Sequence, residues 1–501
     1  MRTIERIRAG LVLLLLLVSL SCSSPLPVVT PEIASPVVSG NEPVLETPQP
    51  NPGRASPTLS SEPEQDLLPL VDQSSKSKHT ATSQPGASQP NILIIMSDDQ
   101  RFDTMDYMPE TQAQIFDQGV TFTRGYITTD SCCPSRASML TGLYAHHHGV
   151  LVNQDELHKP TFVEDLNAAG YNTGLVGKYL NSWNGEPRPE FDYWVSFDGG
   201  GSPYNDPELN VQGVWGHFPG YITYLLEDYA QQFIQEAAQK PEPFLLIFTP
   251  TAPHDPANPA PGDENLYPDL KPYRPPSFDE QDISDKPAWM QEYEPYSEEL
   301  IQDIDTFRRK QLQTLHSLDQ SVSEILKTLK ETGQLDNTFI VYYSDNGYFW
   351  GEHRLRRGKT YAYEEGILVP FAIRYPPLVP KPRIDSHLVA NIDLAPTFYQ
   401  LAGLPVPKSI DGLSLIPLLE GKDNGWRENL IIENWASRFG SYYAIRSDQY
   451  LYVDWNGYDS ELYDMQVDPF QLDNRENDPE YAWVIDHFRK FLKENVPSSN
   501  Q

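Results

Sequence analysis

The chain has 501 residues, a length that fits two or three ordinary domains or one large α/β enzyme with an appended segment. A composition of 39% hydrophobic and 21% charged residues is that of a globular protein with a buried core. The formal net charge of −33 repels nucleic acids and anionic membranes, so we expect no nucleic-acid partner. Three cysteines are too few for a disulfide-rich scaffold or a four-cysteine zinc site.

The N-terminus has the pattern of an export signal. Arg2, Arg6 and Arg8 precede an apolar run at residues 11–20, which is too short to span a bilayer. The run ends shortly before Cys22, and this arrangement resembles a bacterial lipoprotein signal in which Cys22 becomes the lipidated first residue. Cleavage near this point to give an ordinary secreted protein is the alternative. We therefore expect export to the cell surface or periplasm, with membrane contact only through a lipid anchor.

Residues 23–90 are a separate segment with 13 prolines, 12 serines and few aromatic residues. Such a composition cannot bury enough apolar surface to offset the entropy lost on ordering. We expect a disordered, extended tether between the signal (residues 1–22) and the folded body.

Four short apolar runs stand out in the part that follows. They lie at residues 92–96, 173–177, 244–249 and 339–343. Helical patterns lie between them, as expected for an α/β sheet that is covered on both faces. Thr161 and Glu164 form a candidate capping box for one helix, which we expect to stop at Gly170.

The longest predicted helix runs from about Thr306 to Glu331, with Gly333 after its end. Apolar residues at helical spacing form the stripe that we expect to be buried. They are Leu312, Leu315, Val322, Ile325, Leu326 and Leu329.

Polar side chains follow each apolar run. They are Asp98 and Asp99, Lys178, His254, and Asp345 with Asn346. Because the carboxyl ends of parallel strands meet at one edge of an open sheet, we expect these side chains to gather there. A single polar residue after a strand is common in loops. Polar residues of these types after all four strands favour a functional site.

Asp98, Asp99, Asp345 and Asn346 offer only oxygen ligands. Hard oxygen donors select Ca²⁺ or Mg²⁺ over zinc or copper. An adjacent Asp pair is by itself usually a solvated turn, so the metal hypothesis depends on the whole set.

The most specific segment is Cys132-Cys133-Pro134-Ser135-Arg136, which continues to Gly142. Pro134 suits the first turn of a helix and Gly142 its end, which places Cys132 at a helix N-terminus where an anion is stabilised. Two buried cysteines or a thiol nucleophile are simpler explanations, but neither accounts for the Pro-Ser-Arg that follows.

This segment resembles the Cys-x-Pro-Ser-Arg signature of the type I sulfatases. Further matching motifs lie at residues 177–181, 252–254, 344–348 and 389–397, and the resemblance extends from Asn91 to about Asp473. The chain is most similar to the N-acetylglucosamine-6-sulfatase-like members. The resemblance implies an alkaline-phosphatase-like α/β sandwich, with a large mixed sheet between helices and a small C-terminal antiparallel sheet.

The resemblance also implies a nucleophile and a cofactor. Cys132 would be oxidised by a maturase to formylglycine, whose hydrate offers one hydroxyl to attack sulfur and a second to expel sulfate. The metal would be held by Asp98, Asp99, Asp345, Asn346 and the modified Cys132, with Ca²⁺ the usual ion and Mg²⁺ an alternative.

The same resemblance assigns roles to four further residues. Arg136 would steady the formylglycine, and Lys178 and Lys359 would contact sulfate oxygens. His254 would protonate the leaving alkoxide.

A departure from the common family pattern is Leu180, where many sulfatases have a histidine. We interpret it as a mark of the subgroup. His147 and His148 follow the signature helix, and one of them could replace the missing histidine in the substrate pocket. His353, in the basic stretch before Lys359, is a further candidate for substrate binding.

We place the catalytic domain at residues 91–424 and a C-terminal subdomain at 425–501, to which we assign no chemistry. The expected function is removal of O-sulfate from the end of a sulfated saccharide such as N-acetylglucosamine 6-sulfate. The alternatives are a phosphate or phosphonate ester hydrolase of the same superfamily and a catalytically inactive, glycan-binding surface lipoprotein.

Overall fold

The computed structural model describes residues 89–422 and 425–497. The predicted signal, the lipidation site Cys22 and the tether up to residue 88 lie outside the described residues. Among the helices of the described part, none combines the length and the apolar character needed to cross a membrane.

The four apolar runs form the centre of a ten-stranded mixed sheet. In spatial order these strands are β9 (Thr338–Ser344), β1 (Asn91–Ser97), β8 (Phe244–Thr249) and β4 (Asn172–Gly177). All four are parallel, and every residue of β1, β8 and β9 is buried. Burial on both faces explains why these segments are apolar without alternation.

Shorter strands extend the sheet on both sides. Beyond β9 lie β10 (Phe371–Arg374), β2 (Val120–Phe122) and β11 (Arg383–Asp385); beyond β4 lie β5 (Tyr193–Ser196), β6 (Glu208–Val211) and β7 (Val214–His217). The pairs β9–β10, β10–β2, β5–β6 and β6–β7 are antiparallel, so the sheet is mixed as predicted. A separate two-stranded sheet pairs β3 (Gly125–Tyr126) with β12 (Val389–Ala390).

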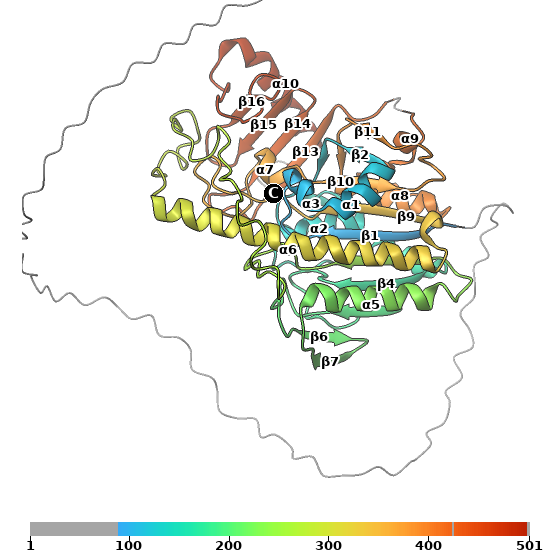
Figure 1. The fold of residues 1–501 in the computed structure, drawn as a ribbon. Coiled ribbons are helices and arrows are strands. Elements are labelled where there is room, and N and C mark those ends of the chain that lie inside the picture. Colours follow the sequence, from blue (N-terminus) through green and yellow to red (C-terminus); the bar gives the residue numbers. More distant parts are fainter. Residues whose placement is uncertain (1–88, 423–424, 498–501) are drawn as a thin grey trace, which may run out of the picture. The chain divides into compact units, whose positions relative to one another are not determined.

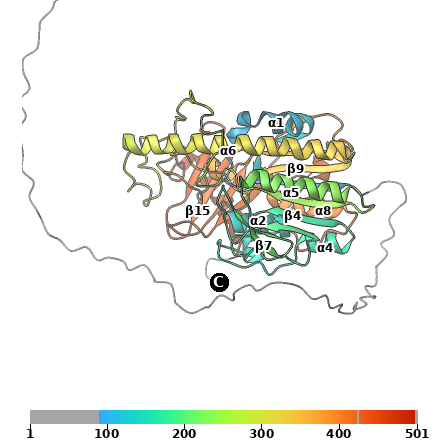
Figure 2. The same cartoon turned by 60° about the horizontal axis from the view of Figure 1, so that its bottom comes forward.

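Helices cover both faces of the central sheet (Figures 1 and 2). One face carries α1 (Pro109–Gln114), α5 (Ile222–Ala237) and α6 (Glu298–Glu331), and the other carries α2 (Cys132–Thr141), α4 (Phe162–Ala168) and α8 (Leu394–Leu401). Successive residues of β1 enter the two cores in turn: Leu93 packs into the first and Ile94 into the second. The predicted sandwich is therefore confirmed.

Apart from one longer helix near the C-terminus, the remaining helices of the described residues are short. They are α3 (Ala145–His148), α7 (Glu364–Ile367), α9 (Ile416–Leu419) and 3₁₀ turns at Phe102–Tyr107, Phe116–Gln118, Leu335–Asn337, Asn391–Asp393 and Pro479–Tyr481.

The capping signals are confirmed, with one correction to a helix start. Thr161 and Glu164 form both hydrogen bonds of a capping box at the start of α4. Helix α6 begins at Glu298, well before the predicted Thr306, because Ser297 caps it by accepting a hydrogen bond from the Leu300 N–H. Its first turns carry exposed acidic residues, although Leu300 and Ile304 extend the apolar stripe toward this start, so the prediction placed the start too late.

The C-terminal part forms the predicted small antiparallel sheet. Its strands are β13 (Asn429–Asn434), β14 (Tyr442–Ser447), β15 (Tyr450–Trp455) and β16 (Glu461–Asp464). One face packs on α10 (Ala482–Asn495), and the other shares a core with Tyr126 and Ile127 of the main part. This second contact brings β13 against the segment that precedes α2, since the Glu433 N–H donates to the Thr128 carbonyl at 2.9 Å.

Gly177, the last residue of β4, has a φ of +120°, and a Cβ there would lie 2.1 Å from the Thr249 carbonyl oxygen. We expect Gly177→Ala to lower the free energy of unfolding by more than about 3 kcal/mol, since both a strained φ and a backbone clash oppose it. Gly333→Ala is the control: its φ is +72°, but no atom lies within 4 Å of its Cβ position, so we expect a loss of about 1 kcal/mol. Urea denaturation of both variants measures the difference, and equal losses would contradict the clash.

Candidate active site

The carboxyl ends of β1 and β9 bring four oxygen-bearing side chains together. The strands are in register at Ser97 and Ser344, so the residues that follow them are neighbours. The Asp99 N–H donates to Asp345 Oδ1 at 3.2 Å, and Asn346 Nδ2 donates to Asp99 Oδ1 at 2.7 Å. Together with Asp98, these residues are at most 2% exposed.

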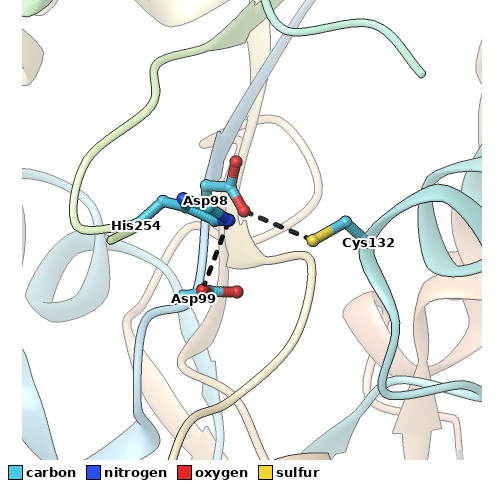
Figure 3. A group of neighbouring side chains, drawn as sticks. All are labelled: Asp98, Asp99, Cys132 and His254. Atoms are coloured by element: carbon cyan, nitrogen blue, oxygen red, sulfur yellow. Dashed lines mark hydrogen bonds and ion pairs between the residues drawn. The ribbon is translucent and has the colours of Figure 1, made fainter. Parts of the chain in front are cut away.

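Asp99 has a left-handed backbone with a φ of +68°. This conformation is unfavourable for most residues but is tolerated by Asp. The turn directs Asp98 and Asp99 toward one cluster (Figure 3). A strained residue at this point is typical of a functional site.

Cys132 faces the two aspartates from the opposite side. It is the first residue of α2 and is 1% exposed. Its Sγ lies 3.7 Å from Asp98 Oδ1 and 2.7 Å from Lys359 Nζ. Ligand atoms of Asp98, Asp99, Cys132 and His254 lie within 4.8 Å of one another (Figure 3), which is close enough to hold one metal ion.

Three cations surround the carboxylates. Lys178 Nζ donates to Asp98 Oδ2 at 2.6 Å, and Arg136 Nε donates to Asp345 Oδ2 at 2.8 Å. Arg136 is further held by the Lys178 carbonyl oxygen, to which its Nη1 donates at 2.8 Å. Lys359 Nζ contacts Asp99 and lies 3.3 Å from Asn346 Oδ1. Three carboxylates thus face three fixed cations.

These charges shift the pKa values of the groups that carry them. Burial raises the pKa of Asp98, but Lys178, His254 and Arg136 outweigh it and lower that pKa to about 2. Burial also raises the pKa of Asp99, but Lys359 and His254 outweigh this and lower that pKa below its ordinary value. Burial opposes the charge on Lys178, yet Asp98 and Cys132 raise its pKa above the ordinary value. The charged forms are therefore the stable ones in this cluster.

His254 reaches the cluster from the loop after β8. Its Nδ1 lies 2.7 Å from the Asp255 carbonyl oxygen, which can only accept, so Nδ1 carries a proton and Nε2 faces Asp99 Oδ2 at 3.7 Å. The side chain is 26% exposed. Burial lowers its pKa, but Asp99 and Asp98 outweigh this and raise it to about 10. The imidazole can therefore supply a proton to a group bound beside Asp99.

A pocket of about 340 Å³ adjoins this cluster and shares Lys359 with it. Its other walls come from the segment before α2, the loop after α3 and the end of β13. The lining residues are Ser131, Val152, Asn153, Gln154, Lys359, Thr360, Trp435 and Ala436. The charged cluster thus has a neighbouring space in which a ligand can bind.

Residues 90–404 match the family model described as "Sulfatase", and this stretch contains every residue of the cluster. The chain belongs to the sulfatase family. Residues 351–497 also match the C-terminal region of N-sulphoglucosamine sulphohydrolase, which covers the small antiparallel sheet.

Among curated proteins, the chain is similar to the extracellular sulfatase SULF-1 homolog of Drosophila melanogaster, with 34% identity over 70% of this chain and 33% of that protein. It is 33% identical to human N-acetylglucosamine-6-sulfatase over 70% of this chain and 68% of the human protein. This sulfatase chain therefore spans about a third of the length of the fly relative and about two thirds of the human one.

A solved structure also resembles the fold of this sulfatase. It is a protein in complex with its substrate D-glucosamine-2-N,6-O-disulfate, with a TM-score of 0.73 and 26% identity. The match covers 83% of this chain and all of that one. The similarity therefore includes both the central sandwich and the C-terminal sheet.

The three histidines expected to bind substrate each have a partner outside the charged cluster. His148 is 3% exposed, shares a hydrogen bond with Ser138 and accepts one from the Val150 N–H. His147 is half exposed and pairs with Asp411. His353 is completely buried and pairs with Glu280. The structure does not bring these side chains into the cluster, and their role in substrate binding stays a prediction.

The sequence analysis assigned no chemistry to the C-terminal sheet and named none of its residues at the site. Asp130, two residues before Cys132, accepts hydrogen bonds from Asn434 and from the Tyr442 hydroxyl, the latter at 2.9 Å. Trp435 and Ala436 then line the pocket. The only sequence signal was the polar Asn434 and aromatic Trp435 at a strand end, and more than 300 residues separate them from Cys132.

Proposed function

We propose that this chain is a sulfuric ester hydrolase that acts at Cys132 after its conversion to formylglycine by a maturase. The observation that carries the proposal is the position of Cys132 at the start of α2, facing Asp98 and Lys359 within a buried cluster of charges. A formylglycine hydrate at this position supplies one hydroxyl for attack on sulfur and a second for release of sulfate.

The cluster suits a divalent cation, for which we propose Ca²⁺, with Mg²⁺ as an alternative. Asp98, Asp99, Asp345 and Asn346 supply hard oxygen donors, and the modified Cys132 would supply a further one. The Lys359 ammonium lies against Asp99, Asn346 and Cys132, so these groups already surround a positive charge. When bound, the ion polarises a sulfate oxygen and acidifies the attacking hydroxyl.

The neighbouring side chains then have separate tasks. Arg136 orients Asp345 and steadies the modified Cys132, because its guanidinium is held rigidly between Asp345 and the Lys178 carbonyl. Lys178 and Lys359 contact sulfate oxygens and offset the charge that grows in the transition state. His254 Nε2 protonates the departing alkoxide.

For the substrate we propose a sulfated saccharide with a terminal N-acetylglucosamine 6-sulfate or a close analogue. The names of the human relative and of the sugar in the similar structure support this class. The name of the fly relative supports export, and lipidation at Cys22 remains part of the proposal. We also propose that residues 91–424 form the catalytic domain and 425–501 the C-terminal subdomain.

The test compares kcat/KM for N-acetylglucosamine 6-sulfate with kcat/KM for the matching 6-phosphate, using protein from maturase-competent cells. We expect sulfate release, with the sulfate ester strongly preferred. Preference for the phosphate ester would favour the phosphate or phosphonate hydrolase instead. Saccharide binding without turnover of either ester would favour an inactive binding protein.

Replacing His254 should lower kcat by different amounts for substrates with different leaving groups. We expect His254→Gln to lower kcat for the sugar sulfate by about 100-fold or more, because a sugar alkoxide needs a proton on departure. With 4-nitrophenyl sulfate, whose phenolate leaves unaided, the loss is expected to be far smaller. Equal losses for both substrates would contradict the role of His254 as general acid.

A further inference from the structure

We infer that Trp435 is the platform on which the sugar ring of the substrate stacks, so that the C-terminal sheet determines substrate specificity. The inference rests on the proposed function and concerns a residue from a part of the chain to which no chemistry was assigned. Trp435 follows directly on β13 and lines the pocket that shares Lys359 with the cluster.

The orientation of Trp435 is fixed from two directions. Its ring meets the ring of Tyr443 edge to face, with centroids 5.6 Å apart and planes at 88°. The backbone around it is held by Asn434, whose side-chain carbonyl accepts hydrogen bonds from the N–H groups of Ala436 and Ser437. An aromatic ring held in this way can offer its face to a ligand at little cost in side-chain entropy.

The same turn is tied to the residues around Cys132. Asn434 Nδ2 donates to Asp130, two residues before Cys132, and the neighbouring Glu433 N–H donates to the Thr128 carbonyl. The distance between Trp435 and the reacting atoms is therefore set by direct hydrogen bonds. Asn434 acts in this arrangement as a positioning residue.

The lining of the same pocket also includes amide groups. Asn153 Oδ1 is occupied, since it accepts hydrogen bonds from the Cys133 N–H at 3.0 Å and from Ser131 Oγ at 3.1 Å. This leaves the Nδ2 group of the same amide to donate to a ligand. Gln154, the next residue, is exposed and also lines the pocket. A pocket that combines amides with an aromatic ring is well suited to bind the hydroxyl groups and the apolar face of a sugar.

The charge of the pocket limits which sugars can bind in it. Lys359 is the sole cation among its lining residues, and its ammonium, which lies against Asp99 and Cys132, is assigned to the sulfate group of the substrate. A uronate carboxylate would thus enter the pocket without a free cationic partner, which is unfavourable. The volume of about 340 Å³ is at the lower end of small-molecule sites. We conclude that the pocket receives an uncharged hexosamine ring that bears the sulfate.

The experiment measures KM and kcat for N-acetylglucosamine 6-sulfate and the inhibition constant of inorganic sulfate, in the full-length, metal-loaded enzyme. We expect Trp435→Ala to raise KM by about 10- to 100-fold, as for the loss of a pocket contact. The inhibition constant of inorganic sulfate should stay within about twofold, because the sulfate contacts are intact. Trp435→Tyr should restore most of the affinity, since it keeps an aromatic face.

The matched control is Trp483→Ala, which removes a tryptophan that is 66% exposed on α10 and should leave KM unchanged. A second comparison uses a 2-sulfated uronate, which should be a substrate at least about tenfold poorer than the hexosamine sulfate. Unchanged KM in Trp435→Ala, or an equal preference for the uronate, would overturn the inference.

A failure of the proposed function looks different from a failure of this inference. If the wild-type enzyme releases no sulfate from any ester, the proposed function fails. Calorimetric titration with N-acetylglucosamine 6-sulfate then still decides the inference, because binding should weaken in Trp435→Ala and persist in Trp435→Tyr.

Discussion

Cys132→Ala is expected to lower kcat for sulfate esters by at least about 10⁴-fold while the protein stays folded. The substitution removes the only atom from which the nucleophile can be made, and no other side chain in the cluster can take its place. Asp98 and Lys359 would lose a neighbour but keep their own ion pairs with Lys178 and Asp99. The measurement is sulfate release, together with the thermal unfolding midpoint.

The adjacent cysteine provides a matched control. Cys133 is also buried, but its Sγ lies 3.9 Å from the Ser182 hydroxyl, and burial raises its pKa. We expect Cys133→Ala to cost about 1 kcal/mol of stability and to leave kcat largely unchanged. Mass spectrometry of the tryptic peptide 125–136 should show an aldehyde at Cys132 in the wild type. Full activity with an unmodified Cys132 thiol would contradict the proposed nucleophile.

Removal of the divalent ion is expected to lower kcat by about 1,000-fold or more, because a metal contributes several kcal/mol to charge stabilisation. Removal of the ion should also lower the stability of the protein, which can be measured without an activity assay. Calcium at 100 times its Kd should add about 2.7 kcal/mol to the free energy of unfolding. Three fixed cations and the protonated His254 already offset the three carboxylates, so a bound dication leaves a net positive site that attracts the sulfate group.

Two charge-matched variants test where the ion binds. Asp99→Asn removes a carboxylate from the cluster and should weaken calcium binding, measured by calorimetry, by at least about tenfold. Asp336→Asn removes the same charge from a side chain that is 83% exposed and should leave the Kd unchanged. If both variants bound calcium as tightly as the wild type, the ion would have to bind elsewhere.

The local features of the fold could be predicted well from the sequence. Strands β1, β4, β8 and β9 are continuous apolar runs because both of their faces are buried, and Thr161 and Glu164 cap α4 through contacts within a single turn. The start of α6 was predicted too late: Leu300 and Ile304 continue its apolar stripe toward the Ser297 cap, but exposed acidic residues lie between them.

The sequence alone also determined which residues follow the central strands, and thus the side chains that meet near Asp98, because parallel strands place their carboxyl ends at one edge. Only the tertiary structure decided the rest of the site. Asn434 and Trp435 arrive from a separate sheet, and Lys359, which only the family resemblance had assigned to the site, reaches Cys132 from a loop beyond β9. The physical reason is that these contacts depend on packing between segments that are distant in the sequence. Such packing produces no periodic pattern in the sequence of either segment. The same packing buries His148 and His353 in hydrogen bonds of their own, and their predicted role in substrate binding stays a prediction.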